Sequence, residues 1–278
     1  MPQPLRYLQI FATFARNSLI RDMTFRANFL IEFISSLSWV FMNLGFYILI
    51  FHYTPSLGRD TGWGKYEFFV FTGTALMINS LAGMLFMTNA DNFGELIRRG
   101  GLDFVLVKPV DTQFLVSLQR VDWSSSGNFL VGLGLAVYSL RCLGVWPSPV
   151  TIVLYVFYLL CGVVILYSLM FLLAATAVWL GRNETLFDFW FYIVSFGRYP
   201  MEIYEGRFGR PFRWFFTFII PVLVAINVPS RFLVQSIRPQ SLEEWLLPLY
   251  TIAATVIVFA VCRAVFQLAL HSYRSASS

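Results

Sequence analysis

Charged residues are scarce in this sequence. They occupy 13% of its 278 positions, whereas hydrophobic residues occupy 58% and the mean hydropathy is +0.67. A soluble protein would carry about a quarter charged residues. The apolar residues come in runs that approach or exceed the roughly 20 positions needed to cross the hydrocarbon core of a bilayer. The composition therefore excludes a soluble globular domain and predicts an all-α protein that crosses a membrane several times.

Cysteine and histidine are also rare. The three cysteines, Cys142, Cys161 and Cys262, lie in or beside apolar runs and show no CxxC spacing, which argues against a disulfide framework and a zinc site. His52 and His271 belong to no HExxH motif, so a histidine-ligated metal site is not expected either. With acidic clusters missing as well, no catalytic set is evident and we expect a non-enzymatic chain.

Lysine occurs only at Lys65 and Lys108, and neither position can serve a phosphate-binding loop. That loop requires GxxxxGK followed by Ser or Thr, because main-chain amides hold the phosphates while the lysine and hydroxyl serve phosphate and Mg²⁺. Here Tyr66 follows the first lysine and Pro109 follows the second. We therefore expect this chain to bind no nucleotide or other cofactor. Any ATP-driven role requires a partner subunit that holds ATP and Mg²⁺.

Arginine supplies the rest of the positive charge, and its distribution suits a membrane surface better than a nucleic acid. The arginines are dispersed at the ends of apolar segments, where they favour lipid headgroups and carboxylates. Four of them fall in residues 1–28, which we predict to form an interfacial elbow helix without a cleavable signal. Only Arg59 and Lys65 follow the first apolar segment, which favours a cytoplasmic N-terminus.

Six segments are predicted to cross the membrane, which would place both termini on the cytoplasmic side. The stretch 205–245 differs from them, because its apolar run is only about 15 residues long, contains Pro221 and closes at Pro229. We predict an outer re-entrant hairpin there. The predicted spans are 29–51, 68–87, 127–145, 151–180, 185–204 and 246–270.

A long polar break, residues 91–123, separates the second predicted span from the third. Within it, residues 95–99 are compatible with a short helix, Gly100 and Gly101 would end that helix, and residues 102–107 are apolar apart from Asp103. A short amphipathic helix of this kind can bind with its apolar side in a groove of a partner protein, while its charged residues pair with charges at the rim of that groove. The alternative is an ordinary loop that packs on its own helices.

The break also carries a family resemblance. The run GELIRRGGLDFVLVKPVDTQF, followed by QRVDWSSSGN, resembles the loop between the second and third spans of ABC-2-type membrane subunits, in the branch described as ABC-2 family transporter protein. The N-terminal FARNSLIRDMTFRANFLIEFISSLSWVFMNLGFY is similar to the entry of that branch. The most specific part is the Arg-Gly-Gly-Leu-Asp…Lys-Pro run, residues 99–109.

The resemblance implies the permease subunit of an ATP-driven exporter in a bacterial inner membrane, with both termini in the cytoplasm. It implies six spans, an elbow helix, a coupling helix in the loop after the second span, and an outer hairpin before the last span. Its implied partners are cytoplasmic ATPase subunits, a sibling permease or second copy of this chain, and membrane lipids, with no nucleic acid. The contacts that couple it to the ATPase would fall on Glu95, Leu96, Arg98, Arg99 and Leu102.

Polar side chains inside or beside the spans are candidates for the translocation path or a permease interface. Such groups are costly in a bilayer and tend to face protein or water. Helix-to-helix hydrogen bonding and snorkelling at span ends are the alternatives. Arg198 and Glu202 are four residues apart and are predicted to pair on one helix face. The candidates are Asn43, Asn79, Asp188, Arg198 and Glu202.

A transporter of another class remains open. An ion-coupled secondary carrier would need no ATPase partner and would place acidic residues such as Glu32 and Asp188 near the middle of the membrane. Both fall near predicted span ends, which disfavours the carrier. The aromatic content of 18% fits a lipid-facing surface and helix packing, and the alternative is a lateral path for an amphiphilic substrate.

Overall fold

A computed structural model gives the fold and describes residues 3–57, 62–181, 184–234 and 242–273. These residues are helical apart from short connections and an isolated bridge between Ser56 and Gly64. The helices are α1 (Gln3–Thr24), α2 (Arg26–Tyr53), α3 (Lys65–Ala82), α4 (Thr88–Arg98), α5 (Gly101–Leu106), α6 (Thr112–Leu118), α7 (Ser126–Leu143), α8 (Pro149–Ala175), α9 (Ala177–Leu180), α10 (Glu184–Phe196), α11 (Gly209–Trp214), α12 (Val222–Val234) and α13 (Leu242–Ser272).

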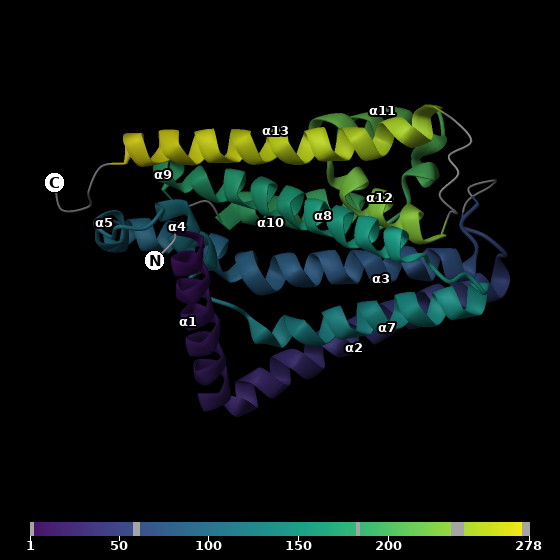
Figure 1. Cartoon of the computed structure of the whole chain (residues 1–278), viewed down its shortest axis with the longest axis horizontal. Coiled ribbons are helices and arrows are strands. Elements are labelled where there is room, and N and C mark those ends of the chain that lie inside the picture. Colours follow the sequence, from purple (N-terminus) through teal and green to yellow (C-terminus); the bar gives the residue numbers. More distant parts are fainter. Residues whose placement is uncertain (1–2, 58–61, 182–183, 235–241, 274–278) are drawn as a thin grey trace.

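The long helices run side by side along the longest axis of the molecule, and α1 lies across them at one end (Figure 1). The C-terminal end of α13, α4 and α5 share that end with α1, whereas α11 and α12 lie at the opposite end. The first helix and the end of the last therefore lie at the same end of the bundle.

Five helical stretches in the described ranges are long and apolar enough to cross a membrane, and the number becomes six if the bent pair α11–α12 is counted as one span. The five confirm the predicted first, second, third, fourth and last spans, and the all-α membrane fold with them. They are Arg26–Tyr53, Lys65–Arg98, Trp123–Leu143, Pro149–Leu180 and Leu246–Ser272.

The predicted fifth span, 185–204, is shorter in the structure. Helix α10 has 13 residues and ends at Phe196. At 1.5 Å per residue it is about 20 Å long, which is less than the hydrocarbon core of about 30 Å. Pro200 lacks an N–H, and a separate 3₁₀ turn, Met201–Glu205, follows it. Proline therefore ends this helix earlier than hydropathy alone predicts.

The second span is longer than predicted. A π-helical turn, Gly83–Met87, joins α3 directly to α4, so the helix passes Asp91 without a break and ends only at Arg98. Phe93 is 1% exposed, which explains why this polar stretch still packs on the bundle. The helix ends where Gly100 adopts φ 69°, a left-handed conformation that costs glycine little.

Small residues allow two close helix crossings. A Cβ added to Gly73 in α3 would lie 2.6 Å from the carbonyl oxygen of Gly132 in α7. A Cβ added to Gly162 in α8 would lie 2.5 Å from the carbonyl oxygen of Ala225 in α12. Membrane helices associate through such backbone approaches because lipid supplies no hydrophobic drive between them. Helices α3 and α7 form the most extensive helix pair of the bundle.

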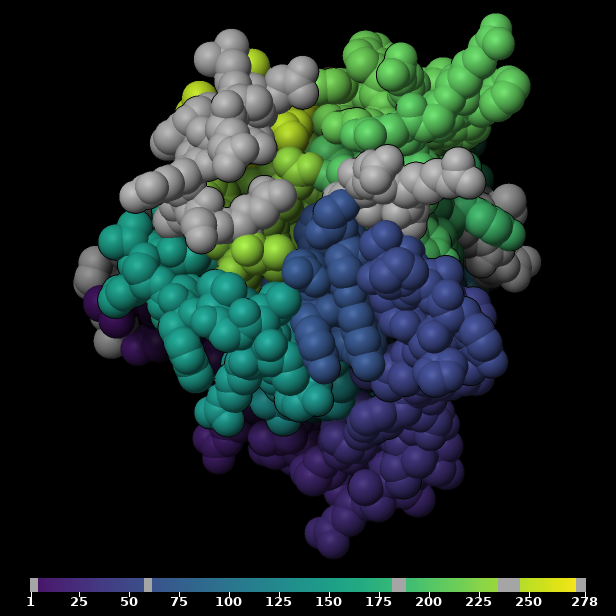
Figure 2. Space-filling view, turned by 90° about the vertical axis from the view of Figure 1, so that its right-hand side faces the viewer, coloured from purple at the N-terminus to yellow at the C-terminus, as the bar shows by residue number. Residues whose placement is uncertain are grey.

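The predicted re-entrant hairpin corresponds to two helical segments, Gly209–Ile219 and Val222–Val234, that meet at 87° around Pro221. Residues 222–230 are all buried, and Asn227 among them accepts a hydrogen bond from the Met201 amide at 3.0 Å. Both segments stay at the end of the bundle far from α1 (Figure 1). In Figure 2, which faces that end, the green part of the chain leading into the hairpin forms the upper corner of the molecule. Residues 235–241 of the predicted hairpin lie outside the described residues.

Candidate functional site

The α4–α6 segment (residues 88–118) places one apolar side inward and another outward. In α5, Leu102 and Val105 are 0% and 6% exposed, and both belong to the main hydrophobic core. Phe104 and Val107, spaced three residues apart, are 74% and 81% exposed. The buried pair anchors α5 on the protein, and the exposed pair forms an apolar surface at the end of the bundle.

Three charged residues predicted for coupling lie beside this surface. Glu95 forms ion pairs with Arg98 and Arg99, at the helical spacings i+3 and i+4. The two arginine side chains are 69% and 77% exposed. Leu96 is partly buried and packs against the core, and Leu102 is fully buried. Leu102, which was expected to contact a partner, is therefore part of the core, and the exposed apolar side chains that follow it are Phe104 and Val107.

Asp111 fixes the α4–α6 segment to the last span. Its Oδ1 accepts the Phe114 amide hydrogen bond at 2.9 Å, which caps α6. Both carboxylate oxygens also accept hydrogen bonds from Arg263 of α13. The same guanidinium reaches Gln113 Oε1 at 3.0 Å. Partial burial tends to raise the pKa of the Asp111 carboxyl, but the hydrogen bonds from Arg263 and the Phe114 amide hold that pKa below its usual value.

The segment is also bonded to α8. Gln113 donates to the Tyr167 hydroxyl at 2.9 Å, and Ser117 shares a hydrogen bond of 2.9 Å with the same hydroxyl. The Tyr167 ring packs on Phe86 in the π turn, with ring centroids 4.6 Å apart. We call this set the Asp111 network; its members are Asp111, Gln113, Ser117, Tyr167 and Arg263.

Helix α1 joins the same region from the other side. The Tyr7 hydroxyl accepts a hydrogen bond from the Asp111 amide at 3.3 Å, and its ring meets that of Phe114 edge-on at 4.8 Å. Further along, Ser18 accepts from the Val121 amide at 3.1 Å, and the Trp123 indole donates to the Ala15 carbonyl at 3.1 Å. Helix α1, the predicted elbow helix, therefore packs directly on the connection between the second and third spans.

A groove of about 450 Å³ runs between α2, α3 and α10. It brings together three of the five candidates for the path, Asn43, Asn79 and Arg198. Its other lining residues are mainly aromatic and aliphatic, with a few neutral polar side chains. They are Trp39, Val40, Leu44, Tyr47, Thr72, Ala75, Leu76, Ala82, Gly83, Met87, Asn128, Met170, Trp190, Phe191, Val194 and Ser195.

Comparison with known proteins agrees with this architecture. The family described as ABC-2 family transporter protein matches residues 37–277. The chain belongs to this family. Its members are membrane transport components, so the chain is an ABC-2 family permease and a multi-pass membrane protein. No match was found among curated proteins or among solved structures.

Glu202 of the permease lies away from the groove and does not share a helix with Arg198, because α10 already ends at Phe196 and Glu202 belongs to the separate 3₁₀ turn Met201–Glu205. It forms an ion pair with Arg231 of α12 and accepts the indole hydrogen bond of Trp63 at 2.8 Å. The expected pairing of Arg198 with Glu202 is therefore replaced by a cluster that ties the hairpin to the connection before α3. The side chain of Asp188 lies outside the described part of the structure.

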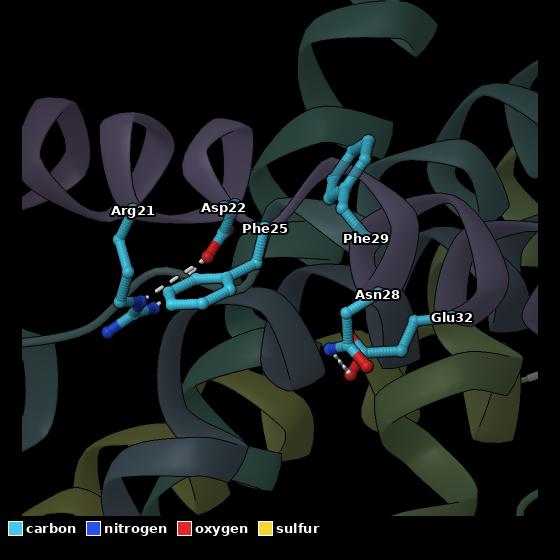
Figure 3. Close-up of a pocket in the computed structure, with 6 residues that line it drawn as sticks. All are labelled: Arg21, Asp22, Phe25, Asn28, Phe29 and Glu32. Carbon is cyan, nitrogen blue, oxygen red and sulfur yellow. Dashed lines mark hydrogen bonds and ion pairs between the residues drawn. The ribbon is translucent and has the colours of Figure 1, made fainter.

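A second hollow, of about 340 Å³, lies at the corner between α1 and α2 of the permease. Figure 3 shows its polar side chains in two local pairs: Arg21 with Asp22, and Asn28 with Glu32, whose hydrogen bond is 2.7 Å. Because these groups satisfy one another, the hollow presents no free polar set. Among the described residues, no three His, Cys, Asp or Glu side chains are grouped so that they could hold a metal ion.

Proposed function

We propose that this permease is the membrane half of an ATP-driven exporter. Two permeases, either two copies of this chain or this chain and a sibling, would form the translocation path. Separate cytoplasmic ATPase subunits would bind ATP and Mg²⁺ and supply the energy. Both termini and the α4–α6 segment would face the cytoplasm of a bacterial cell.

The observation that carries this proposal is the build of the α4–α6 segment. It presents exposed apolar and cationic side chains, Phe104, Val107, Arg98 and Arg99, on a support that is buried beneath. An exposed Phe beside arginines matches the composition of protein interfaces, in which aromatic residues and arginine are enriched. A cytoplasmic ATPase with an apolar groove and an acidic rim is the partner that fits it.

The Asp111 network gives this surface a mechanical role. A shift of α5 would reach α6, which packs on it, and hydrogen bonds of Asp111 and Gln113 join the start of α6 directly to Arg263 of α13 and Tyr167 of α8. The continuous helix from Lys65 to Arg98 offers a third connection, since its end carries the arginines. ATP binding to the partner would thereby favour one of two arrangements of the spans through its different affinity for the two.

Co-purification tests the proposal. The tagged permease is isolated from its native membrane and the proteins recovered with it are identified by mass spectrometry. We expect an ATPase and a second permease, or a second copy of this chain. Phe104→Asp/Val107→Asp and Arg98→Glu/Arg99→Glu should each reduce the recovered ATPase by at least about tenfold, the effect of losing interface contacts worth about 1.4 kcal/mol.

Phe208→Asp is the matched control, because Phe208 is also a strongly exposed phenylalanine, at 85%, and directly precedes α11, which lies at the opposite end of the bundle (Figure 1). It should leave ATPase recovery unchanged. Recovery of the permease alone, together with transport driven by a proton or sodium gradient, would contradict the proposal and favour an ion-coupled carrier.

A further inference from the structure

The groove between α2, α3 and α10 has the shape of a site for an elongated molecule. Along α3 and the π turn its lining extends from Thr72 to Met87, 15 residues apart, which corresponds to about 22 Å at 1.5 Å per residue. Its volume of about 450 Å³ falls within the range of small-molecule sites, roughly 300–1,000 Å³. A long, narrow space of this kind, parallel to the spans, suits an extended chain.

Its walls are apolar along most of this length. Trp39 and Phe191 line it while remaining 60% and 58% exposed, and Trp190 and Tyr47 close its inner side. Helix α2, which supplies one wall, is only 11% buried over its apolar window, so the groove opens beside a face of the permease that no other helix in the described residues covers. An apolar chain can therefore enter sideways from the bilayer.

A single charge marks one end of the groove. Among the described residues that line the groove, only Arg198 and Tyr47 are ionisable, and no carboxylate in these ranges forms an ion pair with Arg198. The neighbouring Tyr199 contacts Tyr47, with ring centroids 6.5 Å apart. Arg198 therefore lies at the level of the C-terminal third of α2. Trp190 precedes Arg198 by eight residues and lines the groove nearer the middle of the bundle. An unpaired arginine beside an apolar groove is complementary to one anionic group.

The neutral polar residues of the groove offer acceptors. Asn43 and Asn79 donate their amide hydrogens to carbonyls one turn back in their own helices, both at 2.8 Å. Asn128 donates to Ser36 at 2.6 Å, and its amide oxygen is buried without a hydrogen-bond partner. The amide oxygens are thus left for a ligand, and hydroxyl groups are the donors that they suit.

We infer that this groove binds an anionic amphiphile, with its apolar chain along Trp39, Trp190 and Phe191 and its negatively charged, hydroxyl-bearing headgroup at Arg198. The inference that this amphiphile is also the exported substrate rests on the proposed function. Binding itself does not depend on an ATPase.

Quenching of tryptophan fluorescence by bromine-labelled lipids tests binding on the purified permease in detergent, without any partner. The probes are lysophosphatidylglycerol, which is anionic and carries hydroxyls, and lysophosphatidylcholine, which is zwitterionic, both brominated in the acyl chain. We expect saturable quenching at lower concentration with the first probe. The Trp39→Phe/Trp190→Phe variant should lose that saturable component.

Arg198→Gln should lower the affinity for the anionic probe by about tenfold, the loss expected for one hydrogen bond to a charged group. It should leave the affinity for the zwitterionic probe unchanged. Arg210→Gln is the matched control, because Arg210 is an exposed arginine outside the groove, and it should leave both probes unchanged. Equal quenching by both probes that Arg198→Gln does not alter would mean ordinary boundary lipid and would overturn the inference. Displacement of the probe by inorganic phosphate alone would mean a site for a soluble anion and would overturn it too.

The substrate role is tested separately in proteoliposomes that contain the complete transporter. Lysophosphatidylglycerol should stimulate ATP hydrolysis, and Arg198→Gln should raise the concentration needed by about the same tenfold. If the permease binds the probe saturably but never associates with an ATPase, the groove is still a binding site for an anionic amphiphile, and the proposed function is contradicted. An active ATPase complex whose permease binds no anionic amphiphile would contradict only the inference that the groove is a binding site for such a molecule.

Discussion

Arg263, in the last span, holds both carboxylate oxygens of Asp111, which caps the helix that follows the exposed apolar surface of α5. The two residues are 152 positions apart in the sequence. The pair therefore joins the part of the permease that we propose to meet an ATPase to a helix that spans the membrane.

A double-mutant cycle on this pair should show coupling. Arg263→Gln and Asp111→Asn should each lower the thermal stability of the purified permease, and the double variant should lose less than the sum. Because both side chains are partly exposed, the coupling free energy should be about 1–2 kcal/mol. Arg21→Gln, which breaks an exposed pair with Asp22, is the control and should change stability by less than about 1 kcal/mol. Strictly additive losses would mean that Arg263 and Asp111 do not act together.

The same pair predicts a pH dependence. The pKa of Asp111 is lower in the folded protein than in the unfolded chain, so its contribution is complete above the unfolded pKa of about 4 and is lost as the pH falls through the folded pKa. The stability difference between wild type and Asp111→Asn should therefore be largest near neutral pH and shrink below about pH 4. Melting temperatures of both proteins across this range measure it. A difference that stays constant down to pH 2 would contradict the assignment.

Because α3 packs closely on α7, alanine should lower the stability of the permease at one glycine, Gly73, and not at another, Gly134. Gly73→Ala would bring a Cβ to 2.6 Å from the Gly132 carbonyl oxygen, so the helices must separate, at a cost of about 1–3 kcal/mol. Gly134→Ala, on α7 with open space around it, should be neutral or slightly stabilising because alanine favours helix. Thermal unfolding in detergent distinguishes the two, and equal melting temperatures would show that the crossing tolerates a wider spacing.

Two glutamates near the hairpin should respond differently to truncation. Glu202→Ala removes the partner of Arg231 and of the Trp63 indole from a buried cluster, which typically destabilises by about 3–5 kcal/mol. Glu205→Ala breaks an exposed pair with Arg213 and should cost less than about 1 kcal/mol. Limited proteolysis of the hairpin alongside thermal unfolding would report the loss. A Glu202 variant as stable as the Glu205 variant would show that the contacts of Glu202 with Arg231 and Trp63 do not stabilise the hairpin.

Hydropathy predicted most of the fold because a bilayer demands long apolar helices, and five of the six predicted spans are continuous helices of sufficient length. It failed at residues 197–204, where Pro200 rather than polarity ends the helix. It also placed the end of the second span too early, because the polar run around Asp91 is helical and is held by the buried Phe93. At Pro200 local backbone chemistry, and around Asp91 the packing of Phe93 in the core, outweighed the average hydropathy of the segment.

The candidate sites were predicted in part. The sequence located the exposed charges at Glu95, Arg98 and Arg99, but an unbroken apolar run cannot reveal which of its residues face outward. The i, i+3 spacing of Phe104 and Val107 was the available signal. Asn43, Asn79 and Arg198 were chosen one by one for their polarity, and only the packing of three helices brings them to one groove. The pairing of Asp111 with Arg263 depends on topology, which a single sequence does not specify.

Site-specific photo-crosslinking tests the central claim most directly. Benzoylphenylalanine replaces Phe104 in α5 or, as the matched position at the other end of the bundle, Phe208, and cells that express the complete transporter are irradiated. We expect an adduct with the ATPase subunit from position 104 and none from position 208. An ATPase adduct from position 208 alone, or from neither position while the transporter is active, would contradict the proposal that the α4–α6 segment is the docking site.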